Sequence, residues 1–176
     1  AEVEALFEQV VADFGRLDGL VNNAGLLRDG MLIKLKDGEL QSKMSLNQWQ
    51  SVIDVNLTGT FLCGREGAAA MAKAGNGGVI INISSIAKAG NIGQSNYAAS
   101  KAGVAALVTT WAGELKRFGI RVAGIAPGVM ATEMTEAMKP EALERIKKVI
   151  PLGRLGARNE LADVAIFIIE NDYLNG

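Results

Sequence analysis

Three short apolar runs, separated by longer segments with helical patterns, constrain the fold of this chain more than any other feature. The runs are LDGLV at residues 17–21, VIINI at 79–83 and IRVAGI at 120–125. Each is short for a helix, and the last two are rich in β-branched residues, which is typical of strands covered on both faces. Because helical segments connect successive runs, the pattern predicts an α/β fold with a doubly wound parallel sheet and helices on both faces.

The segments around these runs carry recognisable helix signals. Apolar residues recur at helical spacing from Val3 to Phe14, and Gly15 follows as a stop. Ser45 and Gln48 have the spacing of a capping box. Three further helices are expected at 95–118, 140–149 and about 160–169, and a loop or small hairpin is expected around Asp37-Gly38.

The chain length of 176 residues fits one domain, which we assign to residues 1–176. Three strands are few for a doubly wound sheet, and LDGLV would be left as an apolar edge. In addition, no GxGxxG-type phosphate loop follows any of the predicted strands. We therefore expect the sheet to be incomplete on its amino-terminal side and the missing strands to lie upstream.

Composition excludes several classes of protein. The net charge of −1 offers no basic surface for nucleic acid or for an anionic membrane. No apolar run reaches the roughly 18 residues of a membrane-spanning helix. The single cysteine, Cys63, excludes an internal disulfide and fits a reducing compartment, so we expect a cytoplasmic protein without nucleic-acid or membrane partners.

The chain contains no histidine. This removes the commonest general base, the commonest metal ligand and any Ser-His-Asp triad. We expect no metal site, and any acid–base chemistry must use tyrosine, lysine or carboxylates.

Unusual polar residues follow each predicted strand. Asn22-Asn23-Ala24-Gly25 follow the first strand, Ser84 follows the second and Pro127-Gly128 follow the third. Tyr97 and Lys101 lie four residues apart at the start of the next helix, so both side chains lie on one helix face. Ligands of open α/β sheets bind beyond the carboxyl ends of the strands, and this edge is therefore the expected site.

These residue types suit proton transfer at an alcohol oxygen. A phenol is a poor acid or base at neutral pH, but a lysine ammonium one turn away favours the phenolate and would lower the pKa of Tyr97. The Ser84 hydroxyl could hold a carbonyl oxygen beside the phenol. No side chain carries a hydride, so the reaction would need a nicotinamide, either NAD or NADP.

Each feature alone has an ordinary structural interpretation. Tyr-x-x-x-Lys pairs occur on solvated helix faces, Ser84-Ser85 could be a helix cap, and the strand-end motifs could be plain turns. Asn56, on an otherwise apolar helix, could be a satisfied buried amide. The joint placement at successive strand ends favours a functional site.

The sequence resembles the short-chain dehydrogenase/reductase family. The resemblance rests on NNAG at 22–25, Asn56 in DVNLTG, Ser84 in INISS, YAASK at 97–101 and IAPG at 125–128. The spacings of 28 residues from Asn56 to Ser84 and 13 from Ser84 to Tyr97 are also similar to those of the family. It implies a Rossmann-like sheet and a dehydrogenase or reductase acting on a ketone and its secondary alcohol.

The resemblance also implies roles for individual residues. Tyr97 would be the general acid/base, Lys101 would lower its pKa and bind the nicotinamide ribose, Ser84 would orient the substrate carbonyl, and Asn56 would hold a relay water. The cofactor would also be bordered by Asn23, Ala24 and Gly25 on its adenosine side and by Pro127, Gly128, Val129 and Thr132 on its nicotinamide side.

Within the family, GNIGQSNYAASKAG and NNAGLLRDGMLIKL are most similar to 3-oxoacyl-[acyl-carrier-protein] reductases. Those reductases tend to dock their carrier protein on basic residues, whereas this chain has Phe118 and the run AGNGG at the corresponding places. Acyl-CoA, another small ketone and the reverse reaction of a hydroxyacyl-CoA dehydrogenase therefore stay open, as does a non-catalytic fragment that acts only through association.

The long alanine-rich helix at 95–118 predicts self-association. Val104, Leu107, Val108 and Trp111 spread around it, which is more apolar surface than one core face needs. We expect a homodimer or homotetramer, as in relatives, with burial of this helix inside one chain as the alternative.

Overall fold

The computed structural model describes residues 1–136 and 138–176. Its main sheet has three parallel strands in the order β1-β4-β5, with β1 at Gly19–Asn22, β4 at Gly78–Ile83 and β5 at Ile120–Ile125. These are the three strands that the sequence predicts, and β1 is the expected edge strand. The α/β class with a partial Rossmann-like sheet is confirmed.

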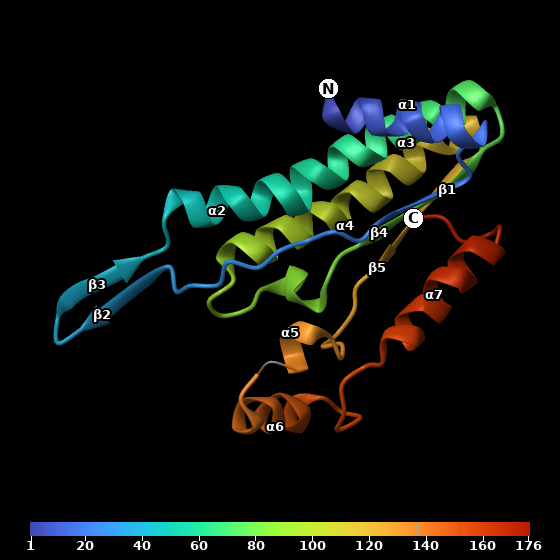
Figure 1. The fold of residues 1–176 in the computed structure, drawn as a ribbon. Helices are drawn as coiled ribbons and strands as arrows, with labels where there is room; N and C mark the ends of the chain where they lie inside the picture. The colour runs from blue at the N-terminus through green and yellow to red at the C-terminus, as the bar shows by residue number, and fades with distance from the viewer. Residues whose placement is uncertain (137) are drawn as a thin grey trace.

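Helices cover both faces of this sheet (Figure 1). On one face lie α1 (Glu2–Phe14), α3 (Gly59–Ala74) and α4 (Ser95–Leu115), and on the other lies α7 (Arg158–Glu170). Because side chains alternate along a strand, each face supplies its own core. The α3/α4 core includes Met71, Ile80, Trp111, Ile120 and Val122, and the α7 core includes Val79, Ile81, Ala123, Ile125 and Ile168.

Glycine allows α3 and α4 to approach closely. A Cβ atom built on Gly64 would lie 2.4 Å from the six-membered ring of Trp111, nearer than real Cβ atoms lie to carbon. The indole is almost fully buried against this bare stretch of α3. The contact fixes α4, whose first turns carry Tyr97 and Lys101.

The residues that predicted a second apolar side of α4 lie inside the chain. Val104, Val108 and Trp111 are buried, and Leu107 packs against the same core. The alternative interpretation is therefore correct for these four side chains, because α4 is covered by other helices as well as by the sheet. Among the described residues, no helix is long and apolar enough to cross a membrane.

Shorter elements connect this framework. The capping box of Ser45 and Gln48 is confirmed at the start of α2 (Leu46–Ile53), which passes through the π-helix η1 (Asp54–Thr58) into α3. The remaining elements are η2 (Ile86–Ala89), η3 (Lys116–Phe118), α5 (Glu133–Glu136) and α6 (Pro140–Val149).

The predicted hairpin projects from the body of the molecule (Figure 1). It consists of β2 (Ile33–Lys36) and β3 (Glu39–Lys43), and every residue of both strands is exposed. Asp37 and Gly38 both have positive φ, 54° and 81°, as a tight two-residue hairpin turn requires.

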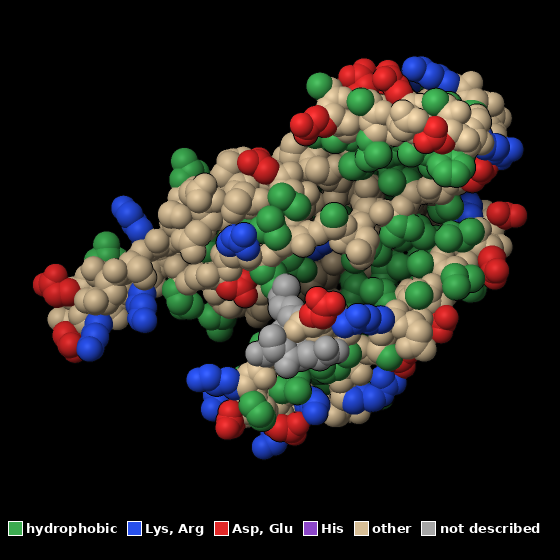
Figure 2. Space-filling model, viewed as in Figure 1, with side chains coloured by type: hydrophobic (Ala, Val, Ile, Leu, Met, Phe, Trp, Pro, Cys, Tyr) green, Lys and Arg blue, Asp and Glu red, His purple; other side chains and the backbone are tan. Residues whose placement is uncertain are grey.

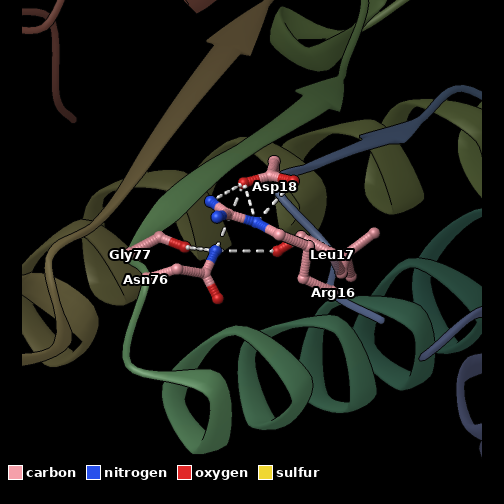
Figure 3. Close-up of polar contacts among 5 residues, drawn as sticks. All are labelled: Arg16, Leu17, Asp18, Asn76 and Gly77. Carbon is pink, nitrogen blue, oxygen red and sulfur yellow. Dashed lines mark hydrogen bonds and ion pairs between the residues drawn. The ribbon is translucent and has the colours of Figure 1, made fainter. Parts of the chain in front are cut away.

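The amino-terminal ends of β1 and β4 are joined by a polar cluster (Figure 3). The side-chain amide of Asn76 donates to the carbonyl of Leu17 (3.1 Å) and to that of Gly77 (2.9 Å), while Arg16 binds Asp18 beside it. This cluster lies at the opposite end of β4 from Ser84, so it stabilises the sheet away from the candidate site.

Hydrophobic side chains gather over the hollow between α1 and α7 (Figure 2). The edge strand contributes to this surface, since Val21 is 46% exposed. On α7, Val164, Ile166, Phe167 and Ile169 are also exposed. The apolar edge that the sequence predicts is therefore present.

Candidate active site

The polar residues at the strand ends meet at one edge of the sheet. Backbone hydrogen bonds join two of the loops: the N–H of Ser84 donates to the carbonyl of Ile125 (2.7 Å), and that of Ile86 donates to the carbonyl of Pro127 (3.1 Å). The segment after β4 therefore runs beside the segment after β5, as parallel strands with a common carboxyl edge require.

Tyr97 and Lys101 lie in the first turns of α4, directed at this edge. The Lys101 ammonium is 5.7 Å from the centre of the Tyr97 ring. Lys101 is only 4% exposed, and its Nζ donates to the carbonyl of Ile83 at the end of β4 (2.7 Å). The predicted pair is thus brought together, with the ammonium held between helix and sheet.

The two neighbouring serines have different partners. Ser84 is 5% exposed, and its Oγ donates to the backbone carbonyl of Lys101 (2.7 Å). The Ser85 side chain instead acts on the Tyr97 phenol, whose pKa it lowers, and its Oγ accepts from the N–H of Ala87 (3.1 Å). Ser84 is the serine expected beside the phenol; its hydroxyl is bonded to the backbone of α4, and Ser85 is the serine that acts on the phenol.

Strand alternation is the signal that could have distinguished the serines. Ile80 faces the α3/α4 core, so Asn82 and Ser84, two and four residues on, are directed to the same side. A hydroxyl at position 84 therefore contacts the side of α4 that packs on the sheet. Ser85 follows one residue later, so its side chain is not directed to that side.

The pKa of Tyr97 is raised above its ordinary value. Burial is the main cause and the Asp29 carboxylate adds to it, while the hydrogen bond with Ser85 acts in the opposite direction. The lowering predicted from the Lys101 spacing is therefore not what this structure gives, because burial of the phenol dominates. Burial also lowers the pKa of Lys101. The phenol is consequently protonated at neutral pH and can act as a proton donor.

Asn56 lies in the π-helix η1 and is fully buried. Its Oδ1 accepts from the N–H of Leu26 (2.8 Å), and its Nδ2 donates to the carbonyl of Leu26 (3.1 Å) and to Ser100 Oγ (3.2 Å). Single π turns within helices are frequent at functional sites. Asn56 is thus a satisfied buried amide that also fastens the NNAG segment to α4.

Gly25 brings that segment close to Lys101. A Cβ atom on Gly25 would lie 3.3 Å from Asn56 Oδ1 and 3.6 Å from Lys101 Nζ. A larger residue would crowd both groups, so glycine keeps this corner of the site open.

The residues expected at the cofactor occupy two loops of this edge. Asn23, Ala24 and Gly25 are exposed after β1. After β5, a Cβ on Gly128 would meet nothing within 4 Å, the carbonyl of Val129 accepts from the N–H of Gly156 (3.0 Å), and the N–H of Thr132 donates to Thr135 Oγ1 (2.8 Å). The exposed segment after β1 and the uncovered Gly128 flank the Lys101 ammonium, which has donors left besides the one bound to Ile83, and such groups can hold the hydroxyls of a dinucleotide.

Comparisons with known proteins show which family the chain is similar to. A family model described as enoyl-(acyl carrier protein) reductase matches residues 1–176. The chain is 42% identical over 178 residues to the 3-oxoacyl-[acyl-carrier-protein] reductase FabG of Thermotoga maritima, and 40% identical over 178 residues to that of Staphylococcus aureus; each alignment covers 99% of this chain and 68% of the relative. It is 44% identical over 175 residues to the human (3R)-3-hydroxyacyl-CoA dehydrogenase, with 97% and 64% covered.

Proposed function

The chain belongs to the short-chain dehydrogenase/reductase family, and on that premise we propose that it is an NAD(P)-dependent reductase of 3-oxoacyl thioesters. Members of this family are oxidoreductases that interconvert a C=O group and a CH–OH group. The observation that carries the proposal is the partly buried phenol of Tyr97, with Lys101 one turn away and its ammonium 5.7 Å from the ring centre.

The chemistry that a nicotinamide would supply when bound at this edge is the hydride for the carbonyl carbon. Tyr97 gives its proton to the carbonyl oxygen as negative charge develops there. Ser85 holds that oxygen beside the phenol, since a hydroxyl can rotate to donate where it is needed. The Lys101 ammonium, held by the Ile83 carbonyl, stabilises the phenolate that remains.

We assign to Ser85 the hydroxyl that orients the substrate. Ser84 is the alternative, and single replacements of the two serines distinguish them. The support is twofold: the Ser85 side chain lowers the pKa of the phenol, whereas the Ser84 hydroxyl donates to the backbone of α4. In the reverse reaction, the same phenolate would accept the proton of the alcohol.

The cofactor would lie along the loops after β1 and β5, as NAD or NADP. We propose that Lys101 binds its ribose, while Asn56 and Lys101 take part in a water relay that returns the proton to Tyr97. The closeness of Gly25 to both side chains supports this relay. The remaining cofactor contacts would come from Asn23, Ala24, Gly25, Pro127, Gly128, Val129 and Thr132.

The names of the relatives support a thioester substrate, carried by acyl carrier protein in one case and by coenzyme A in the other. Phe118 lies just before β5, at the amino-terminal edge of the sheet, whereas the candidate site is at the carboxyl edge, so this residue does not distinguish the two carriers. We propose acyl-CoA as the first substrate to test.

Acetoacetyl-CoA with NADH or NADPH tests the proposal, with loss of nicotinamide absorbance as the readout. We expect turnover with one donor at least, and its loss by two or more orders of magnitude in Tyr97→Phe. Crotonyl-CoA is the matched control for an enoyl reductase, because its reduction places the proton on carbon. Nucleotide binding without turnover of any ketone would instead support a non-catalytic role.

We propose that residues 1–176 act as one dinucleotide-binding and catalytic domain of a cytoplasmic homodimer or homotetramer. A groove of about 330 Å³ between α3 and α4 supports self-association. Its lining includes Phe61, Ala72, Leu115 and Phe118 together with the charged Arg65 and Glu114, and the two phenylalanines are exposed.

A further inference from the structure

Asn96, the residue before Tyr97, is fully buried and uses both donors and the carbonyl oxygen of its amide. Its Oδ1 accepts from the backbone N–H of Tyr97 (2.8 Å), and its Nδ2 donates to the carbonyls of Arg28 (2.9 Å) and Gln48 (3.0 Å). These three bonds fix the orientation of the amide. Sequence analysis did not select Asn96, because an asparagine at a helix start is usually read as a cap.

The bond to Tyr97 compensates for an uncapped helix. The first four N–H groups of a helix have no partner within it, and Tyr97 is the third residue of α4. Gln94, at the N-cap position, makes no side-chain capping bond. Asn96 therefore supplies the acceptor that the N-cap residue does not.

The two donated bonds connect Tyr97 with separate parts of the fold. Arg28 lies between β1 and the hairpin, and Gln48 lies in α2. The segments also meet beside Asn96, where the N–H of Gly30 donates to the carbonyl of Gly93 (2.8 Å) and Gln94 Nε2 donates to Asp29 Oδ2 (2.9 Å). Among these hydrogen bonds, only the one between the Tyr97 N–H and Asn96 Oδ1 involves the backbone of Tyr97.

We propose that Asn96 is a positioning residue, which fixes the first turn of α4 so that the Tyr97 phenol meets Ser85. The proposal rests on the function proposed above. A phenol lies far from its own Cα, so a small rotation of this turn displaces its oxygen considerably, and misplacement of about 1 Å can reduce a rate by about a hundredfold.

The groups that act on the phenol define the expected signature. Ser85 approaches it from the loop after β4, Asp29 from the segment after β1, and Lys101 from α4 itself. The Ser85 bond lowers the pKa of Tyr97, whereas Asp29 raises it. If Asn96 no longer holds the turn, the Ser85 bond weakens and the pKa of Tyr97 rises further.

The test compares Asn96→Ala and the milder Asn96→Ser with the parent. Serine keeps a short acceptor near the Tyr97 N–H but cannot reach both carbonyls. Asn76→Ser is the matched control, because Asn76 also donates to two carbonyls across two segments, at the far end of the sheet (Figure 3). Each variant is assayed with acetoacetyl-CoA and titrated by NMR of ¹³C-labelled tyrosine, with Tyr97→Phe identifying the signal.

We expect both Asn96 variants to lower kcat by about tenfold or more, with KM within about threefold, and to raise the pKa of Tyr97. Asn76→Ser should lower the melting temperature alone. An unchanged Tyr97 pKa and kcat in folded Asn96 variants would overturn the inference, as would failure of both variants to fold. The NMR titration does not depend on turnover. If the parent protein had no reductase activity, the proposed function would be refuted, but the pKa of Tyr97 in the Asn96 variants would still decide the role of Asn96.

Discussion

Replacing the two adjacent serines one at a time gives the sharpest test of the site. Ser85→Ala removes the hydroxyl that bonds the Tyr97 phenol and would also hold the substrate oxygen. One donor to a developing oxyanion typically contributes about 10²–10³ in kcat, or about 3 kcal/mol. We expect a loss of that size from Ser85→Ala, together with a loss of about 1 kcal/mol in stability because the N–H of Ala87 loses its capping acceptor.

Ser84→Ala should lower the stability without the large loss of turnover. It removes the 2.7 Å bond from Ser84 Oγ to the carbonyl of Lys101, in a buried position. Such a bond contributes about 1 kcal/mol to stability, which corresponds to about 2–4 °C in the melting temperature of a domain of this size. We expect kcat to stay within a few-fold of the parent.

Steady-state kinetics with acetoacetyl-CoA and thermal melts of both variants provide the measurement. If Ser84→Ala lost about a hundredfold in kcat while Ser85→Ala kept its rate, the assignment drawn from the hydrogen bonds would be wrong. The Tyr97 signal in the NMR titration gives an independent check, since only Ser85→Ala should raise the pKa of the phenol.

Three further outcomes are expected. The raised pKa of Tyr97 keeps the phenol protonated, so the rate of ketone reduction should be constant through neutral pH and fall only in alkaline solution. The rate of alcohol oxidation should instead rise with pH, because that reaction needs the phenolate. Initial rates with the opposite pH dependence would contradict this. Gly64→Ala should cost about 1–3 kcal/mol in denaturant unfolding because its methyl meets Trp111, while Gly113→Ala, with nothing within 4 Å, should be neutral or stabilising. Phe118→Asp, at the α3/α4 groove, should reduce the assembly mass in light scattering, and an unchanged mass would remove the groove as an interface.

Much of the fold could be predicted because local signals agree with it. Gly15 and Gly119 end their helices in the left-handed conformation, and Pro140 begins α6 as expected. Asp37-Gly38 likewise forms the predicted hairpin turn. Such signals act within a few residues, so one sequence is enough to read them.

The site was less predictable because its properties depend on tertiary neighbours. The spacing of Tyr97 and Lys101 predicted their common face but not the burial that raises the pKa of the phenol. The choice between Ser84 and Ser85 depends on which one faces α4, and a family spacing of 13 residues cannot detect that. Asn96 matters through the carbonyls of Arg28 and Gln48, which lie 68 and 48 residues away in sequence.

The exposed β2–β3 hairpin also has a practical consequence. Since neither strand buries a residue, this part of the chain can be cut, extended or labelled without opening the core. Its base is nevertheless fastened to the turn before Tyr97 through Gly30 and Gly93. A fluorophore attached near Gly38 would therefore be linked, through the hairpin and the Gly30–Gly93 hydrogen bond, to the turn that precedes Tyr97. A change in its emission on addition of a ligand would report binding at the candidate site.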